Sequence, residues 1–102
     1  MIGKLEEIVL MALFRAGQDA VPSEVYDWVT KGQKAAGFGA VYTVLGRMAL
    51  KGLVSEGTKD GPGGKPRRTF TITGKGRAAL DEAVNATVAI RDHGKEGAHV
   101  FE

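Results

Sequence analysis

The chain has 102 residues, of which 43% are hydrophobic and 25% charged, and this is the composition of one globular domain with a modest core. It contains no cysteine, which excludes disulfides and thiolate metal sites and fits a reducing cytoplasm. The sequence has no run of about 18 apolar residues and no basic leader followed by an apolar stretch, so neither a membrane span nor a secretory signal is expected.

Positive charge is concentrated in the middle of the chain. The formal net charge is only +2, but residues 32–77 hold nine Lys or Arg against two Asp or Glu, a net +7. Residues 1–31 and 78–102 carry −2 and −3. A continuous basic block is expected of a protein that binds the phosphate backbone of a nucleic acid. A chance cluster of surface cations is the alternative.

Residues 4–16 are predicted to form a helix that ends at Gly17. One face carries apolar residues at helical spacing: Leu5, Ile8, Val9, Ala12 and Leu13. The other side is also largely apolar, with Leu10, Met11 and Phe14. A helix that is apolar nearly all round is buried on two sides, so we expect the second side to contact another subunit. Part of a ligand pocket is the alternative for Met11 and Phe14.

Two further helices are predicted, at residues 22–32 and at about 38–51, with a turn at 33–37 between them. Proline suits the first turn of the earlier helix. Residues 18–21 form a connector that can hold a very short strand. In the later helix the residues expected to point to the core are Val41, Leu45 and Met48.

A β-hairpin is predicted next. Residues 53–58 and 67–73 are expected to be its strands, because Arg68, Phe70 and Ile72 alternate with threonines in the second of them. Residues 59–66 contain three glycines and two prolines, which excludes regular structure there.

The chain is expected to finish with a helix over residues 74–91, capped by Thr73, and a flexible tail over 92–102. The predicted fold is therefore α+β: helix, short strand, helix, helix, strand, wing, strand, helix. This is the order of a winged helix-turn-helix that binds double-stranded DNA. Residues 1–73 would form the DNA-binding domain and residues 74–91 a dimerisation helix.

Three segments resemble a known family. Residues 39–54 (GAVYTVLGRMALKGLV) combine a Gly-Ala-Val-Tyr-Thr helix start, an apolar-x-Arg-apolar middle and a Lys-Gly-Leu-Val exit, and they resemble the signature of the PadR family of winged-helix transcriptional regulators. Residues 67–80 resemble the family's strand and its Thr-x-x-Gly helix opening, and residues 4–14 are similar to its first helix. The resemblance spans about residues 3–90 and implies homodimeric DNA-binding repressors, often released by a small ligand.

The sequence departs from the family pattern in three respects. Gly74 stands where proline is usual. Gly46 stands mid-helix where a longer polar residue is usual, at a cost of about 1 kcal/mol in helix propensity. A single C-terminal helix replaces the longer sensing and dimerising domain of larger members.

Candidate DNA contacts lie on the helix at 38–51 and on the wing. Thr43 and Arg47 are expected on its outer side, and arginine can pair bidentately with guanine for ~1–3 kcal/mol of discrimination. The resemblance suggests that the Tyr42 hydroxyl contacts a phosphate, while a core aromatic is the alternative. The full predicted set is Lys34, Tyr42, Thr43, Arg47, Lys51, Lys65, Arg67 and Arg68. Solvated surface charges and a solubilising hairpin tip are the alternatives for the cations.

A two-fold dimer would place two recognition helices ~34 Å apart on a pseudo-palindromic operator. The interface residues predicted for it are Leu5, Ile8, Met11, Leu80, Val84 and Val88. Trp28 could stack on a flat aromatic effector, or could be core.

Catalysis is not predicted. Gly37-Phe38-Gly39 lacks the third glycine of a dinucleotide-binding turn, and Gly64-Lys65 is followed by proline rather than the Ser or Thr of a P-loop. His93 and His99 lack the spacing of a metal site, so no metal or cofactor is expected.

We predict a sequence-specific, homodimeric repressor in a prokaryotic cytoplasm, associated with the nucleoid. The alternatives are a winged-helix protein–protein docking module, and a small-molecule sensor whose DNA role is secondary.

Overall fold

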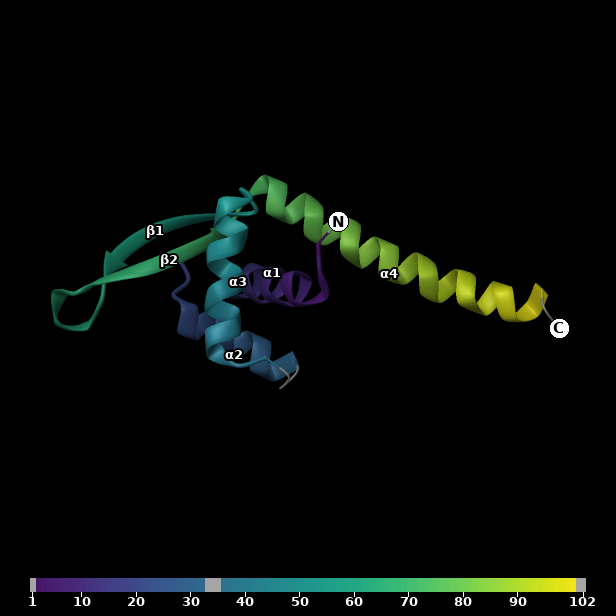
Figure 1. Cartoon of the computed structure of the whole chain (residues 1–102), viewed down its shortest axis with the longest axis horizontal. Helices are drawn as coiled ribbons and strands as arrows, with labels where there is room; N and C mark the ends of the chain where they lie inside the picture. Colours follow the sequence, from purple (N-terminus) through teal and green to yellow (C-terminus); the bar gives the residue numbers. More distant parts are fainter. Residues whose placement is uncertain (1, 33–35, 101–102) are drawn as a thin grey trace.

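The computed structural model describes the backbone of residues 2–32 and 36–100, and side chains as far as residue 91. Three helices form a body, a β-hairpin projects from one side of it, and the last helix projects from the other (Figure 1). The elements in chain order are α1 (Lys4–Ala16), α2 (Pro22–Gly32), α3 (Phe38–Leu50), β1 (Val54–Asp60), the 3-10 turn η1 (Pro62–Gly64), β2 (Pro66–Ile72) and α4 (Gly74–Val100). This is the predicted α+β winged helix order.

Helix α1 has the predicted bounds and lies at the centre of the core. It packs against α2, α3, α4 and β2. Leu10, which was expected on a side facing another subunit, is fully buried within its own chain together with Val9 and Leu13. The prediction for Leu10 is wrong because α1 has neighbours of its own on both sides. Met11 and Phe14 do remain exposed.

The predicted short strand before α2 is a single antiparallel bridge between Ala20 and Phe70. Ala20 N–H donates to the Phe70 carbonyl at 3.0 Å, and Phe70 N–H donates back at 2.8 Å. Strand β2 therefore has hydrogen-bonded neighbours on both sides at Phe70, which anchors the base of the hairpin to the helical body.

The hairpin is longer and more regular than predicted. Its antiparallel register runs from Val54 opposite Ile72 to Asp60 opposite Pro66, so both ends of the segment expected to be irregular belong to strands. Proline is tolerated at Pro66 because it is the first residue of a strand. The irregular part is the short turn that contains Gly63 and Gly64, whose φ angles of 72° and 76° favour glycine.

Helix α4 begins as predicted. The Thr73 hydroxyl accepts a hydrogen bond from Gly76 N–H at 3.0 Å, and it donates to the Gly52 carbonyl at 2.7 Å. Gly76 packs so closely against the segment between α3 and β1 that a Cβ there would be 1.9 Å from the Leu53 carbonyl oxygen. This contact explains the glycine of the Thr-x-x-Gly opening.

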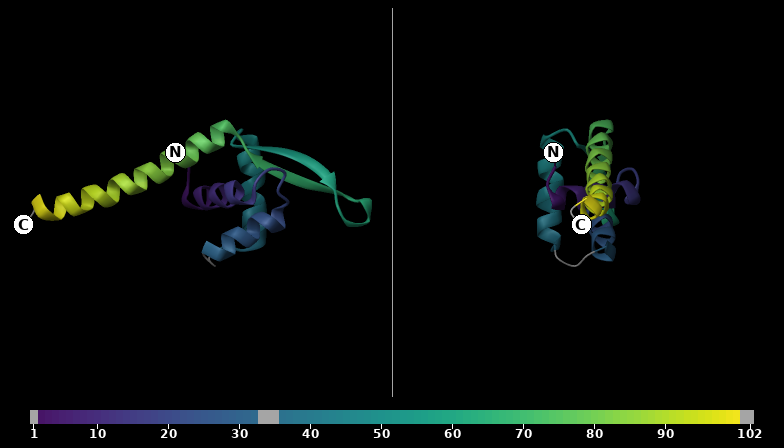
Figure 2. Two further views of the ribbon diagram at one scale, coloured as in Figure 1. Left: turned by 180° about the vertical axis from the view of Figure 1, so that it is seen from behind. Right: turned by 90° about the vertical axis from the view of Figure 1, so that its right-hand side faces the viewer.

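Helix α4 extends to Val100, so residues 92–100 are helical rather than irregular. The two glycines in this stretch each cost about 1 kcal/mol relative to alanine, but they do not end a helix that is already propagating. Leu80 is buried, whereas Ile90 is 72% exposed, and the C-terminal half of α4 extends away from the body (Figures 1 and 2). None of the helices in the described part of the chain combines the length and apolar character that a membrane span requires.

Candidate nucleic-acid interface

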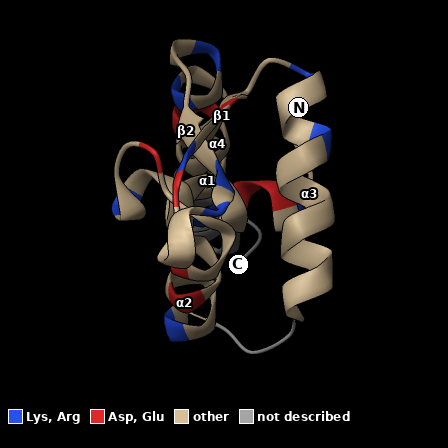
Figure 3. Ribbon diagram, turned by 90° about the vertical axis from the view of Figure 1, so that its left-hand side faces the viewer, with Lys and Arg blue, Asp and Glu red and all other residues tan. Residues whose placement is uncertain are grey.

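Helix α3 exposes one side along its whole length. Its core side is formed by Val41, Val44, Leu45 and Met48. Thr43 and Arg47 are exposed, as the spacing predicted. The N-terminal part of α3 carries no charged residue, and Arg47 lies in its last turn. Figure 3 shows Lys and Arg along the neighbouring hairpin and at the C-terminal end of α3.

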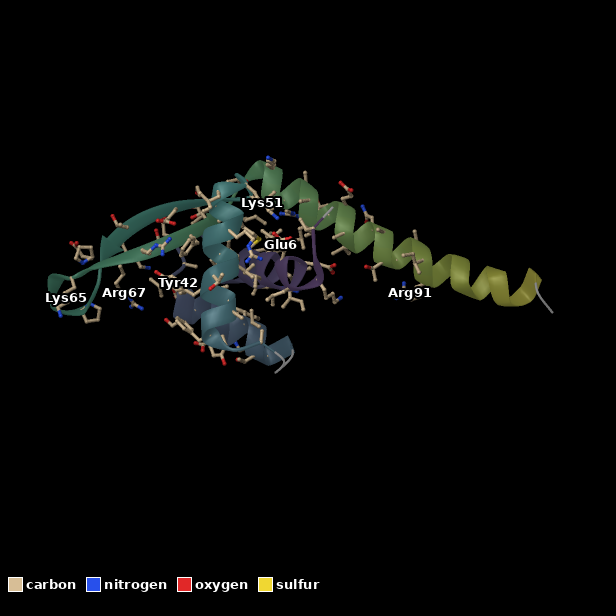
Figure 4. The ribbon with its side chains drawn as sticks, in the orientation of Figure 1. Glu6, Tyr42, Lys51, Lys65, Arg67 and Arg91 are labelled. Carbon is tan, nitrogen blue, oxygen red and sulfur yellow. The ribbon has the colours of Figure 1, made fainter. Side chains whose placement is uncertain are left out.

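Two of the predicted wing cations are free of ion pairs. Within the described part of the chain, neither Lys65 nor Arg67 has a side-chain salt bridge. Lys65 is exposed at the end of the hairpin, and Figure 4 shows both residues there, far from α4. The stem of Arg67 lies over Gly61, where a Cβ would be 2.4 Å from the arginine Cδ. The hairpin therefore presents two cations without competing partners.

Arg68, the third predicted wing cation, is already engaged. Its Nη2 and Nε donate to the two carboxylate oxygens of Glu56, at 2.5 and 3.2 Å. Its Nη1 donates to the Tyr42 hydroxyl at 2.5 Å. The guanidinium carbon also lies 5.0 Å from the Tyr42 ring centre and 5.3 Å from that of Phe70. The Glu56 carboxylate raises the pKa of Arg68 further above its ordinary value, so this side chain stays charged.

An aromatic row continues from this cluster. The rings of Phe38 and Tyr42 lie 6.2 Å apart, and Tyr26 meets Phe38 edge to face at 5.5 Å. Phe38 is 44% exposed at the first turn of α3. Phe38 and Glu56 were not among the site residues predicted from the sequence. The one-turn spacing of Phe38 and Tyr42, and the hairpin register that places Glu56 diagonally opposite Arg68, were the available signals.

Lys51 lies at the other end of α3 and contacts α1. Its Nζ is 2.8 Å from Oε2 of Glu6, and Gly3 N–H donates to the other oxygen of that carboxylate at 2.9 Å. The hydrogen bond from Lys51, then that from Gly3, lowers the pKa of Glu6. Lys51 thus fastens two helices together, a role that the sequence did not suggest. Lys34 lies outside the described residues.

The predicted dimer residues are not equivalent. Leu80 is buried in its own core because the first turns of α4 pack against α1 and β2, so it is not available to a partner. Leu5, Ile8 and Val84 are partly buried, whereas Met11 and Val88 are exposed. A groove of about 890 Å³ between α4, the start of α1 and the end of α3 is lined by further apolar side chains, among them Ile2, Leu50, Ala79, Ala83 and Ile90. Leu50 is 91% exposed there.

Trp28 is at the surface, not in the core. It is 38% exposed, and the Lys31 Nζ lies 4.1 Å from its ring centre. It borders a second groove, of about 410 Å³, between α1 and α2. Besides Trp28 and Lys31, the lining includes the apolar Ile8 and Met11 and the cations Lys4 and Arg15.

The helix pair α2–α3, the hairpin behind it and the bridge at Ala20 define a winged helix-turn-helix protein. The chain belongs to the transcriptional regulator PadR-like family, whose family model matches residues 23–82. It is accordingly a transcription regulator and not an enzyme, and the resemblance of its signature segments is confirmed.

Solved structures show the same fold. A PadR family transcription regulator from Clostridium difficile R20291 is 18% identical, with a TM-score of 0.77, over 94% of this chain and 99% of that one. A PadR-like transcription factor from Bacteroides fragilis is 22% identical, with a TM-score of 0.76, over 90% and 87%. BpsR of Bordetella bronchiseptica, whose DNA binding is regulated by 6-hydroxynicotinic acid, is 22% identical, with a TM-score of 0.66, over 90% and 64%. Comparison with curated proteins finds no match.

Proposed function

We propose that this regulator is a sequence-specific repressor that binds a pseudo-palindromic duplex as a homodimer and is released by a small planar ligand. The observation that carries the DNA-binding part is the pairing of two surfaces. Helix α3 exposes Thr43 and Arg47, and the adjacent hairpin carries Lys65 and Arg67 without ion pairs among the described residues.

The two surfaces suit different parts of a duplex. The N-terminal part of α3 is uncharged, so it can enter a major groove without fixing itself to phosphates. Gly39 and Gly46 leave open space on the helix surface, which permits close approach of its backbone. The wing cations would neutralise phosphates beside or across the minor groove. Each such contact adds ~0.9 to the salt slope, the steepness with which the logarithm of the affinity falls as the logarithm of the salt concentration rises.

The groove beside α4 supports dimerisation. Ile90 and Val88 are exposed on a helix whose C-terminal half extends away from its own body (Figure 2), and Leu50 is exposed across the groove. Burying such side chains contributes about 25 cal/mol per Å² of apolar surface. The partner we propose is a second copy, whose own α4 presents the same apolar residues.

The Trp28 groove supports a ligand site. An exposed indole beside Ile8 and Met11, with cations around it, suits a flat aromatic molecule that carries negative charge. BpsR offers a precedent in the same fold, since its DNA binding responds to an aromatic acid. Repression by occlusion of a promoter would place the protein in the cytoplasm at the nucleoid.

The test is fluorescence anisotropy with a duplex selected by footprinting the DNA upstream of the protein's own coding region. Wild type should bind this duplex more tightly than a scrambled one. Changing Lys65 and Arg67 to Ala should weaken binding to both duplexes and flatten the salt dependence. The matched control, Lys4→Ala, removes a cation from α1 and should have little effect. Equal affinity for both duplexes would contradict sequence-specific regulation and would favour the protein-docking alternative.

A further inference from the structure

Glu56 holds Arg68 in a fixed position beside the recognition helix. The carboxylate takes two N–H groups of the guanidinium, and the Tyr42 hydroxyl takes a third, out of the five that arginine has. A fork-to-fork arginine–carboxylate pair is the strongest common geometry for such a contact. The guanidinium carbon also lies within 5.0 Å of the Tyr42 ring centre and 5.3 Å of the Phe70 ring centre.

This arrangement changes what Arg68 can offer to a duplex. Its charge is balanced by Glu56, and its side chain is kept on the hairpin rather than extended toward phosphates. The Tyr42 hydroxyl accepts from Arg68 and therefore keeps its own proton for donation. Because its partner is a cation, that proton is a better donor to an anionic oxygen.

We propose that Glu56 limits sequence-independent binding by withholding Arg68 from the phosphate backbone, while Arg68 acts as a positioning residue that directs the Tyr42 hydroxyl. The inference rests on the proposed DNA-binding function. Adding a cation that contacts phosphates strengthens binding to every sequence equally, so it adds affinity without discrimination. A carboxylate that restrains one wing cation keeps non-operator binding weak.

The principal experiment compares Glu56→Gln with Asp60→Asn. Both variants remove one negative charge from β1, and the register places both residues diagonally opposite Arg68, but only Glu56 pairs with it, whereas Asp60 has no salt bridge within the described residues. A neutral amide can still accept one hydrogen bond, but it competes poorly with a phosphate for a guanidinium. Binding to a random duplex is measured by anisotropy at several salt concentrations, and thermal melting confirms that each variant is folded.

In Glu56→Gln, affinity for the random duplex should rise on the order of five- to tenfold near 0.1 M salt, and the slope should steepen by ~0.9, the value for one new phosphate contact. Affinity for the operator should rise by a similar factor, because the new phosphate contact strengthens binding to every sequence equally. Asp60→Asn should change affinity less than about twofold and leave the slope unchanged, because it releases no cation. Equal behaviour of the two variants would overturn the proposal.

A second pair of variants keeps the proposal testable if Glu56→Gln does not fold. Arg67→Gln should flatten the slope by ~0.9 for all sequences, because Arg67 has no competing carboxylate among the described residues. Arg68→Gln should leave the slope unchanged and weaken binding to both duplexes by a similar factor, because the Tyr42 hydroxyl loses the partner that directs it. A flattened slope in Arg68→Gln would show that Arg68 contacts phosphate and would refute the proposal. If wild type binds no duplex at all, the proposed function itself fails, a result distinct from all of these.

Discussion

Replacement of Gly76 by Ala is the sharpest structural perturbation in this chain. The residue is in the first turn of α4, where alanine would ordinarily favour the helix by about 1 kcal/mol. Here the added Cβ would stand 1.9 Å from the Leu53 carbonyl oxygen and 2.9 Å from its carbon, and 3.0 Å from a side-chain carbon of Ile72. The first two are backbone atoms, so no flexible side chain can move aside.

The magnitude follows from these opposing terms. Overpacking of a close-packed interior costs about 1–3 kcal/mol, occasionally more, and a contact with backbone belongs at the upper end. After the gain in helix propensity, we expect the free energy of unfolding to fall by about 2–3 kcal/mol. For a domain of this size, that corresponds to a melting temperature lower by roughly 10–20 °C.

Circular dichroism at increasing temperature measures the effect, and Gly74→Ala is the matched control. Gly74 lies in the same turn, but a Cβ there meets nothing within 4 Å. That variant should be as stable as wild type or slightly more stable. If Gly76→Ala had the same melting temperature as Gly74→Ala, the close packing of α4 on the Leu53 backbone would be refuted as the reason for this glycine.

Three further predictions concern single residues. Glu6→Gln should lower the free energy of unfolding by about 1 kcal/mol at neutral pH, a value limited by the half-exposed Lys51. Because folding lowers the pKa of Glu6, this stabilisation is present above about pH 4.5 and is lost as the pH falls through the folded-state pKa, so urea melts of the two proteins should converge in acid. Asp19→Gly should stabilise by about 1 kcal/mol in the same assay, since Asp19 has a φ of 52°, and an unchanged midpoint would argue against strain there. Thr73→Ala should cost about 1 kcal/mol through loss of the helix cap, and a Ser variant should recover most of it.

The elements were predictable wherever local pattern decides structure. The apolar spacing of residues 4–16 and the glycine after them fixed both ends of α1, and the Gly/Pro-rich segment located the turn of the hairpin. The first strand was predicted to end two residues too early, and the second to begin one residue too late, since proline is tolerated at the first position of a strand. Helix α4 was predicted too short because two glycines near its end weaken a helix without ending it.

The contacts of the candidate site were not predictable, because they join residues distant in sequence. Glu6 and Lys51 are 45 positions apart, and Tyr42 and Arg68 are 26 apart. Whether Arg68 extends to solvent or folds back depends on how the hairpin packs against α3, which no periodicity encodes. The prediction that all three wing cations are alike therefore could not distinguish Arg67, which has no carboxylate partner among the described residues, from Arg68, which has one.

Affinity and discrimination are assigned to different surfaces under the proposed function. The part of α3 that would meet base edges is uncharged and would add little to the salt dependence of binding. Lys65 and Arg67 would supply a salt-dependent term that is the same for every sequence. The cluster of Tyr42, Glu56 and Arg68 lies between these two surfaces and connects them through hydrogen bonds. Changes at the wing tip or in the cluster should therefore shift affinity with little change in operator preference, whereas a change at Thr43 on the exposed side of α3 should alter that preference.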